Sequence, residues 1–178
     1  MPFAIRYSPV FCDQIYNKKR KARSEKMNNE QLKERVLILM PEAQLEENKQ
    51  FVSCFIPAEK FHSLVETLMS SEETAMDYLF CLTGVDLGKE LMVVYHLGST
   101  TQGHEIVLKV KTDDRENPAV DTISDLYKSA DFYEREVYDM FGIRFNHHPD
   151  MRRIFLDENW KGFPCRKDYT DEINIIEL

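Results

Sequence analysis

Apolar residues recur at helical spacing in one stretch of the chain. After Pro57 they occupy positions i, i+3, i+4, i+7 and i+8, namely Phe61, Leu64, Val65, Leu68 and Met69. This spacing places them on one face of a helix, and proline is favoured at the start of a helix. The pattern predicts a helix after Pro57 that packs its apolar stripe on a sheet. A more polar helix is predicted over residues 29–36.

Strand-like runs flank the helix that follows Pro57. One short run, 51–56, precedes it, and three runs follow it, over residues 77–85, 91–97 and 105–111. Turn-forming segments separate these three runs, and such short connections predict an antiparallel meander. In the third run Ile106, Leu108 and Val110 alternate with mostly charged residues, which predicts a half-buried strand. The second run is apolar on both faces at 91–95, so we expect it to be central.

The remaining elements complete an α+β pattern. Pro118 is predicted to open a helix whose inward residues are Val120, Ile123, Leu126 and Tyr127. The order helix, strand, helix, three strands, helix predicts an α+β fold, in which a mixed sheet with an antiparallel meander is flanked by helices. We place a basic, flexible leader at 1–27, the α+β domain at 28–145 and an extended C-terminal docking segment at 146–178.

A charge-rich helix is predicted at the end of the α+β domain. Asp131 and Glu134 have the D-x-x-E spacing of a capping box, and Gly142 suits the left-handed residue that closes a helix. The expected core stripe consists of residues four apart: Tyr133, Val137 and Phe141. The charged residues that point elsewhere are Arg135, Glu136 and Asp139. A charge cluster on a helix is usually a solvated face, so spacing alone does not assign these residues a function.

Residues 146–169 have no sustained period. Prolines and charges alternate there with isoleucine, phenylalanine, tryptophan and tyrosine. A segment of this kind cannot build its own core, yet it is too rich in large apolar residues to be a disordered tail. We expect it to lie extended against another surface, either of its own chain or of a partner.

Charge is unevenly distributed along the chain. Residues 1–35 carry nine Lys and Arg against four Asp and Glu, whereas the net charge of the whole chain is -8. The basic run at 17–26 has no aromatic residue on which a base could stack, and the remainder is acidic, so a nucleic-acid binder is not expected. No run approaches the roughly 18 apolar residues of a membrane-spanning helix.

Motifs for independent chemistry are missing from the sequence. The four cysteines, Cys12, Cys54, Cys81 and Cys165, are too widely spaced for a zinc, iron–sulfur or CxxC site, and we interpret them as reduced packing thiols of a cytoplasmic protein. Adjacent His147 and His148 rarely converge on one metal ion, and no HExxH, glycine-rich phosphate loop or GxSxG motif occurs. We therefore predict no catalytic, cofactor-binding or metal-binding residue.

A signature over residues 134–168 resembles a known family. The runs EREVYDMFGI at 134–143, HPDMRRI at 148–154 and PCRKD at 164–168, together with Trp160, are similar in order and spacing to the 30 kDa (C-type) subunit of respiratory NADH-quinone oxidoreductase, complex I. The family commonly has Trp, Gly and Leu where Phe132, His147 and Cys165 stand. These departures leave the branch open, because related subunits occur in plastid-type dehydrogenases, membrane-bound hydrogenases and archaeal cofactor dehydrogenases.

The resemblance implies a structural role without catalysis. Such a subunit lies in the hydrophilic arm of the complex, peripheral to the cytoplasmic side of the membrane, and contacts the membrane only through the complex. Its partners are the large quinone-site subunit and the cluster-bearing subunit. Those neighbours bind NADH, flavin, iron–sulfur clusters and quinone, and the whole enzyme couples electron transfer from NADH to quinone to proton translocation. The alternatives are a homologous subunit of a membrane-bound hydrogenase or related dehydrogenase complex, and a stand-alone acidic α+β binding protein.

The partner interface is predicted to lie on the signature. Its charged members should form ion pairs within the tail and across the subunit boundary, because guanidinium groups make bidentate contacts with carboxylates. The predicted interface residues are Glu134, Arg135, Glu136, Asp139, His148, Pro149, Arg152, Arg153, Trp160, Pro164, Arg166, Lys167 and Asp168.

Overall fold

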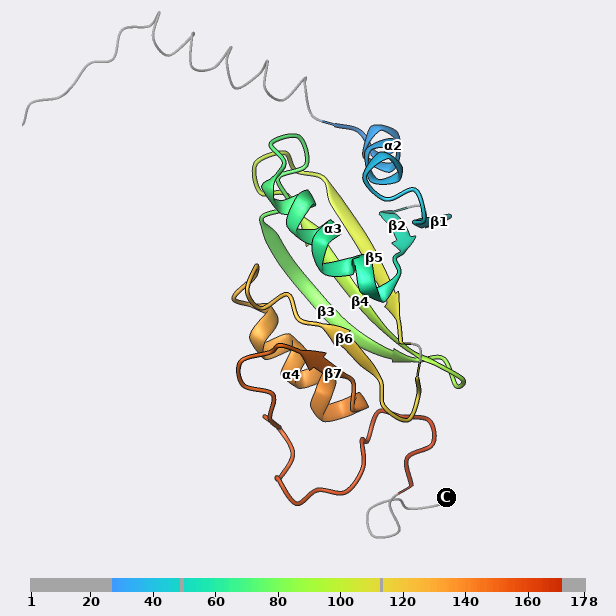
Figure 1. Cartoon of the computed structure of the whole chain (residues 1–178), viewed down its shortest axis with the longest axis vertical. Coiled ribbons are helices and arrows are strands. Elements are labelled where there is room, and N and C mark those ends of the chain that lie inside the picture. Colours follow the sequence, from blue (N-terminus) through green and yellow to red (C-terminus); the bar gives the residue numbers. More distant parts are fainter. Residues whose placement is uncertain (1–26, 49, 113, 171–178) are drawn as a thin grey trace, which may run out of the picture.

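The computed structural model describes residues 27–48, 50–112 and 114–170 (Figure 1). The predicted leader, apart from Met27, and the last eight residues of the predicted docking segment lie outside the described residues. The elements in chain order are α2 (Asn29–Leu39), β1 (Gln44–Glu46), β2 (Val52–Phe55), α3 (Ala58–Ser70), β3 (Tyr78–Asp86), β4 (Leu91–Gly98), β5 (Glu105–Lys111), β6 (Ala119–Asp121), α4 (Ala130–Phe141) and β7 (Arg144–Asn146).

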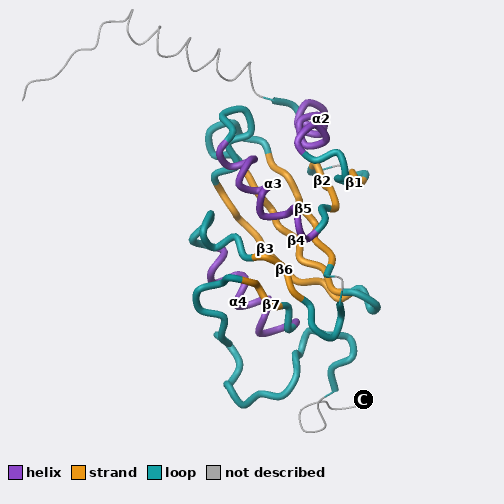
Figure 2. Tube along the Cα trace, in the orientation of Figure 1, coloured by secondary structure: helices purple, strands orange, loops and turns teal. Residues whose placement is uncertain are grey.

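A mixed five-stranded sheet organises the fold (Figure 2). Its strand order is β1-β2-β5-β4-β3, in which β2 and β5 are parallel and the other neighbours are antiparallel. The meander predicted from the three runs after α3 is thus β3, β4 and β5, and the α+β prediction is confirmed. A separate pair of short parallel strands, β6 and β7, was not predicted.

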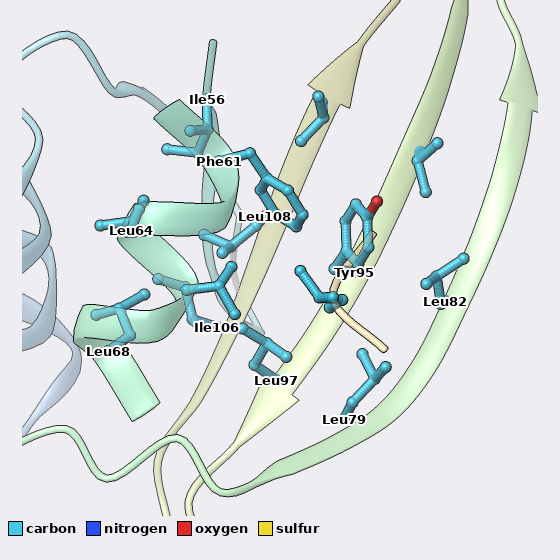
Figure 3. Close-up of a cluster of buried hydrophobic side chains, with 14 of the residues drawn as sticks. Ile56, Phe61, Leu64, Leu68, Leu79, Leu82, Tyr95, Leu97, Ile106 and Leu108 are labelled. Carbon is cyan, nitrogen blue, oxygen red and sulfur yellow. The ribbon is translucent and has the colours of Figure 1, made fainter. Parts of the chain in front are cut away.

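The core lies on one face of this sheet. In β4, Leu91, Val93, Tyr95 and Leu97 share one cluster with buried residues of α2, α3 and α4, whereas Met92 and Val94 belong to a smaller cluster on the opposite face. All three described helices therefore cover the same face. Figure 3 shows α3 seated over β4 and β5, where the ring of Phe61 lies 4.3 Å from that of Tyr95.

The stripe predicted on α3 forms the centre of this core. Phe61, Leu64, Val65 and Leu68 are buried, and only Met69, at the edge of the stripe, is exposed. Complete burial of one such side chain stabilises the fold by roughly 1.5–3 kcal/mol. Helix α2 begins with a capping box, in which Asn28 and Gln31 each accept a hydrogen bond from the other's backbone N–H.

The helix predicted after Pro118 is wrong. Residues 119–121 form strand β6, which pairs with β7 and brings Val120 beside Phe145. Helix formation is further disfavoured because the hydroxyl of Thr122 accepts the backbone N–H of Ser124 in a local turn. Ile123 is nevertheless buried, since apolar spacing reports burial even where the backbone is not helical.

Helix α4 has the predicted end but not the predicted start. Gly142 closes it with a left-handed φ of 74°. The capping box of Asp131 and Glu134 is wrong, because the residue before the helix is Ser129 and it makes no side-chain cap. The Glu134 carboxyl instead accepts the backbone N–H of Ile123. Val137 is buried as expected, with Tyr133 and Phe141 packed at the edge of the core.

Candidate partner interface

The thirteen predicted interface residues lie on α4 and on residues 147–170, hereafter the C-terminal segment. This segment contains no helix or strand. It runs from β7 around α4 and returns towards the β3–β4 turn (Figure 1). Its path is fixed by side-chain contacts with α4, with the end of β3 and with Arg115, which follows β5.

Asp139 of α4 forms the first of these contacts. One carboxylate oxygen accepts the backbone N–H groups of Ile154, Phe155 and Leu156 at 3.1, 2.8 and 3.0 Å. The other oxygen accepts Nη1 of Arg153 at 2.7 Å. Burial raises the pKa of Asp139, but the three backbone N–H groups and the guanidinium outweigh it, so the pKa lies below its usual value. The carboxylate thereby shapes one turn of the C-terminal segment.

Arg153 extends this contact to a more distant part of the segment. Its Nη2 donates to the backbone carbonyls of Trp160 and Gly162 at 3.3 and 3.0 Å. The planar guanidinium thus joins the helix to two points of the segment at once. The side chain of Trp160 is half-buried, and its Nε1 has no acceptor among the described residues.

Phe163 is enclosed by cations and by the end of α4. The guanidinium carbons of Arg153 and Arg166 lie 5.2 and 5.1 Å from its ring centroid, within the range of cation–π attraction. Arg166 Nε also donates to the carbonyl of Phe141 at 2.6 Å. The ring passes so close to Gly142 that a Cβ there would lie 2.4 Å from it.

The last contact involves two residues that sequence reasoning missed, Asp86 and Arg115. Asp86 ends β3 and receives both terminal nitrogens of Arg115 at 2.8 Å. It also accepts the backbone N–H of Lys167 at 2.8 Å, while Arg115 Nη2 lies 2.9 Å from the Asp168 carboxylate. The Arg115 guanidinium holds the pKa of Asp86 well below its usual range. No local pattern reveals this contact, because its members are far apart in the sequence.

Replacing Arg115 with Met should lower the urea midpoint of unfolding at neutral pH, and this effect should shrink progressively as pH falls below the ordinary pKa of aspartate, about 3.9, towards the depressed pKa of Asp86. The folded-state pKa of Asp86 is depressed, so its stabilisation exists above the unfolded pKa and is lost as pH falls. Urea melts across pH measure this. The control is Arg152→Met, since Arg152 is exposed and pairs with Asp150 at the surface. Equal losses in both variants would contradict the expectation.

The start of the C-terminal segment is held by His148 and Arg135. The His148 side chain is fully buried, with Nδ1 accepting the Asp150 N–H at 3.0 Å and Nε2 lying 3.3 Å from the Asp131 carbonyl oxygen. Since Nδ1 accepts, the ring proton belongs on Nε2. Arg135 Nε donates to the Arg152 carbonyl at 3.3 Å.

Exposure divides the predicted interface residues into three groups. Glu134, Arg135 and Asp139 are buried within this chain and contact its own atoms. The exposed members are Glu136, Pro149, Arg152, Lys167 and Asp168, and the remaining five are partly buried. Two aromatic residues outside the prediction, Phe132 and Phe155, are 64% and 66% exposed. A phenylalanine in a segment without apolar periodicity is the sequence signal that could have identified Phe155. Contact with a partner stays a prediction.

The described part of the chain offers neither a metal-binding cluster nor a membrane-spanning helix. Among residues 27–48, 50–112 and 114–170, no three His, Cys, Asp or Glu side chains are grouped so that they could hold a metal ion. No helix in these ranges has the length and apolar character needed to cross a bilayer. Burial raises the pKa of the Cys54 thiol to about 12.

Comparison with known proteins identifies relatives across most of the chain. The C subunit of NADH-quinone oxidoreductase from a Roseiflexus species is 38% identical over 147 residues, covering 80% of this chain and 84% of the relative. The C/D subunit of the same enzyme from Phocaeicola vulgatus is 49% identical over 124 residues, or 69% of this chain. The chain spans only about a quarter of that relative, 24% of its length.

A solved structure shares the fold. A chain of the membrane-bound sulfane sulfur reductase, an archaeal respiratory membrane complex, superposes with a TM-score of 0.65 at 25% identity, covering 81% of this chain and 86% of that one. The family model described as the 30 kDa subunit of respiratory-chain NADH dehydrogenase matches residues 54–173. That range includes the meander, α4 and the described C-terminal segment. The chain therefore belongs to the family of the 30 kDa subunit of respiratory-chain NADH dehydrogenase.

Proposed function

We propose that this chain is a non-catalytic structural subunit in the hydrophilic arm of an NADH-quinone oxidoreductase, and that it docks through the C-terminal segment. The observation that carries this proposal is the way the segment is held. The segment's backbone forms hydrogen bonds with the side chains of Asp139, Asp86 and Arg153. The side chains of Phe155 and Arg152 are instead exposed to solvent. A segment with no core of its own is thereby shaped in advance for a partner.

The partners proposed are the large quinone-site subunit and the cluster-bearing subunit. The relative from Phocaeicola vulgatus is named a C/D subunit, which supports a subunit of the D type as a direct neighbour. In this proposal NADH, flavin, iron–sulfur clusters and quinone are bound by neighbours, electron transfer is coupled to proton translocation elsewhere in the complex, and this chain binds no cofactor. The complex would place the chain on the cytoplasmic side of the membrane without direct lipid contact.

The outward residues of the segment have the character of interface anchors. Aromatic and arginine side chains carry a disproportionate share of binding energy at protein interfaces. Phe155 fits this role because its backbone N–H is fixed by Asp139 while its ring remains mostly exposed. Its position is therefore defined before any partner binds.

Replacing Phe155 with Ala should weaken docking by about 2 kcal/mol, the usual threshold for a central interface residue. The stability of the isolated chain should change little, because the ring is 66% exposed. The measurement is the yield of assembled complex from cells expressing the variant, together with NADH-quinone turnover per assembled complex. Ile38→Ala is the matched control, since Ile38 is 69% exposed on α2, away from the segment.

Two results would contradict the proposal. Equal assembly of the Phe155 and Ile38 variants would show that the segment does not dock through this ring. Full assembly of the Phe155 variant with lost turnover would show that the segment acts in the reaction.

The solved relative favours one alternative, a homologous subunit in another respiratory membrane complex. That chain belongs to a sulfane sulfur reductase and is 25% identical to this one. The subunits named NADH-quinone oxidoreductase are more similar, at 38% and 49%. Assaying the purified complex with NADH and a quinone, and separately with a sulfane sulfur compound, distinguishes the two.

A further inference from the structure

Glu134 is a buried carboxyl group that the docking proposal does not use. It lies on α4 and is 0% exposed. Its Oε1 accepts the backbone N–H of Ile123 at 2.9 Å, and its Oε2 lies 2.5 Å from the hydroxyl oxygen of Thr122. Within the described part of the chain, no lysine or arginine forms an ion pair with it. A buried carboxylate without a cation is costly, and protonation removes that cost.

The groups around Glu134 add negative rather than positive charge. Nearby carboxylates are those of Asp125, after β6, and of Asp131, on α4 itself. From β4, the hydroxyl of Tyr95 is buried and has no hydrogen-bond partner among the described residues. From the C-terminal segment, His148 Nε2 lies 3.9 Å from Glu134 Oε2 and 3.5 Å from the Asp131 carboxylate. The imidazole is thus the group of the segment that faces this carboxyl.

We propose that Glu134 is a proton-binding site whose occupancy controls how firmly the start of the C-terminal segment is held at His148. The site has a route to solvent. Thr122, whose hydroxyl contacts Glu134, lines an open cleft together with Ser124 and His62. Thr122 therefore lies between the carboxyl and the cleft, and a proton can reach Glu134 by way of this residue. This inference concerns the chain itself and does not depend on the proposed function.

The hydrogen bonds around Thr122 differ between the two protonation states. With Glu134 protonated, its O–H donates to the Thr122 hydroxyl oxygen, and the Thr122 O–H donates to Ser124 Oγ, 2.8 Å away. With Glu134 ionised, the single Thr122 proton turns to the carboxylate, and the Ser124 hydroxyl becomes the donor to Thr122 Oγ1. The released proton passes to water in the cleft. The two states therefore differ in the direction of these hydrogen bonds, and the ionised state also has a buried charge with no cation beside it among the described residues.

The direction of the pH effect follows from linkage. Burial raises the pKa of Glu134 from 4.5 to about 7, against the opposing hydrogen bonds from Ile123 and Thr122. A local opening that lifts His148 and admits water returns the carboxyl to its ordinary pKa. The closed state therefore loses stability as pH rises from 4.5 towards 7, and the loss levels off above 7. The opening equilibrium constant should increase by up to about 300-fold across this window.

Amide hydrogen exchange on the full chain tests the proposal, with intrinsic rates corrected for pH. The informative amides are those of Ile123, which donates to Glu134, and of His148 and Asp150 at the start of the segment. Protection should fall from about pH 5.5 to about pH 7 and then remain constant. Glu134→Gln should remove this dependence, because the amide keeps the acceptor and cannot ionise. Glu136→Gln is the matched control, since Glu136 is exposed on the same helix.

Protection that is independent of pH in the natural chain would overturn the proposal, as would an unchanged dependence in Glu134→Gln. A carbon-13 NMR titration of the glutamate side-chain carboxyls of the natural chain decides the matter without any variant. A resonance assigned to Glu134 with a midpoint near pH 7 is expected. A midpoint at the ordinary value of 4.5 would mean that Glu134 is not the proton-binding site.

Discussion

Replacing Asp139 with Asn is expected to release the middle of the C-terminal segment and to lower the free energy of unfolding by about 3–5 kcal/mol. The carboxylate is fully buried and receives Arg153 together with three consecutive backbone N–H groups. An asparagine keeps one oxygen but directs an N–H₂ group at donors, so it leaves a buried guanidinium or several N–H groups unpaired. Urea unfolding measures the loss, and limited proteolysis locates the released segment.

The control for this variant is Asp157→Asn. Asp157 lies in the same segment but is exposed, so losing its charge should change stability by less than about 0.5 kcal/mol. If the two variants unfold at the same urea concentration, or if proteolysis does not cut within residues 147–170 of Asp139→Asn, Asp139 does not hold the segment.

Gly142→Ala should also be strongly destabilising, and for two separable reasons. At φ 74° an added Cβ costs roughly 1–2 kcal/mol of backbone strain. The same Cβ would lie 2.4 Å from the ring of Phe163, which must then leave the space between Arg153 and Arg166. Displacing a packed ring adds about 1–3 kcal/mol. Thermal or urea unfolding gives the sum.

Gly88→Ala separates the two costs. Gly88 has φ 92°, but a Cβ there would meet nothing within 4 Å. This variant should therefore show only the backbone strain, and the difference between the two variants measures the contact with Phe163. Equal losses of stability in the two variants would mean that a Cβ at position 142 does not disturb the ring of Phe163.

Local pattern predicted the meander and the covering helix well. The strand over residues 105–111 has the same bounds in the sequence prediction and in the structure, because apolar and charged residues alternate there. The prediction of a helix after Pro118 was wrong because Val120 lies in a short strand that pairs with β7, and only the folded chain brings β7 near. Strands of three residues, such as β1, carry too little pattern to be recognised.

The candidate interface was located by its signature, but its inner construction could not be predicted. A row of charges on α4 gives no indication that Asp139 turns to backbone N–H groups fifteen residues or more further along. The buried position of Glu134 contradicts the usual exposure of glutamate, so composition points the wrong way. Asp86 ends β3 and Arg115 follows β5, so their pairing requires the meander of β3, β4 and β5 to be formed.

The parallel pairing of β2 with β5 has a consequence for the order of folding. Strands β3, β4 and β5 are joined by short turns, so their contacts close small loops. Strand β2 instead pairs with β5 across α3, β3 and β4, which lie between them in the chain. This pairing places Val52 beside Ile106. Closing that long loop costs conformational entropy before the contacts between β2 and β5 can stabilise the pair. The meander with α3 can therefore form as an early nucleus, whereas the β1–β2 edge, which also carries α2, joins it late.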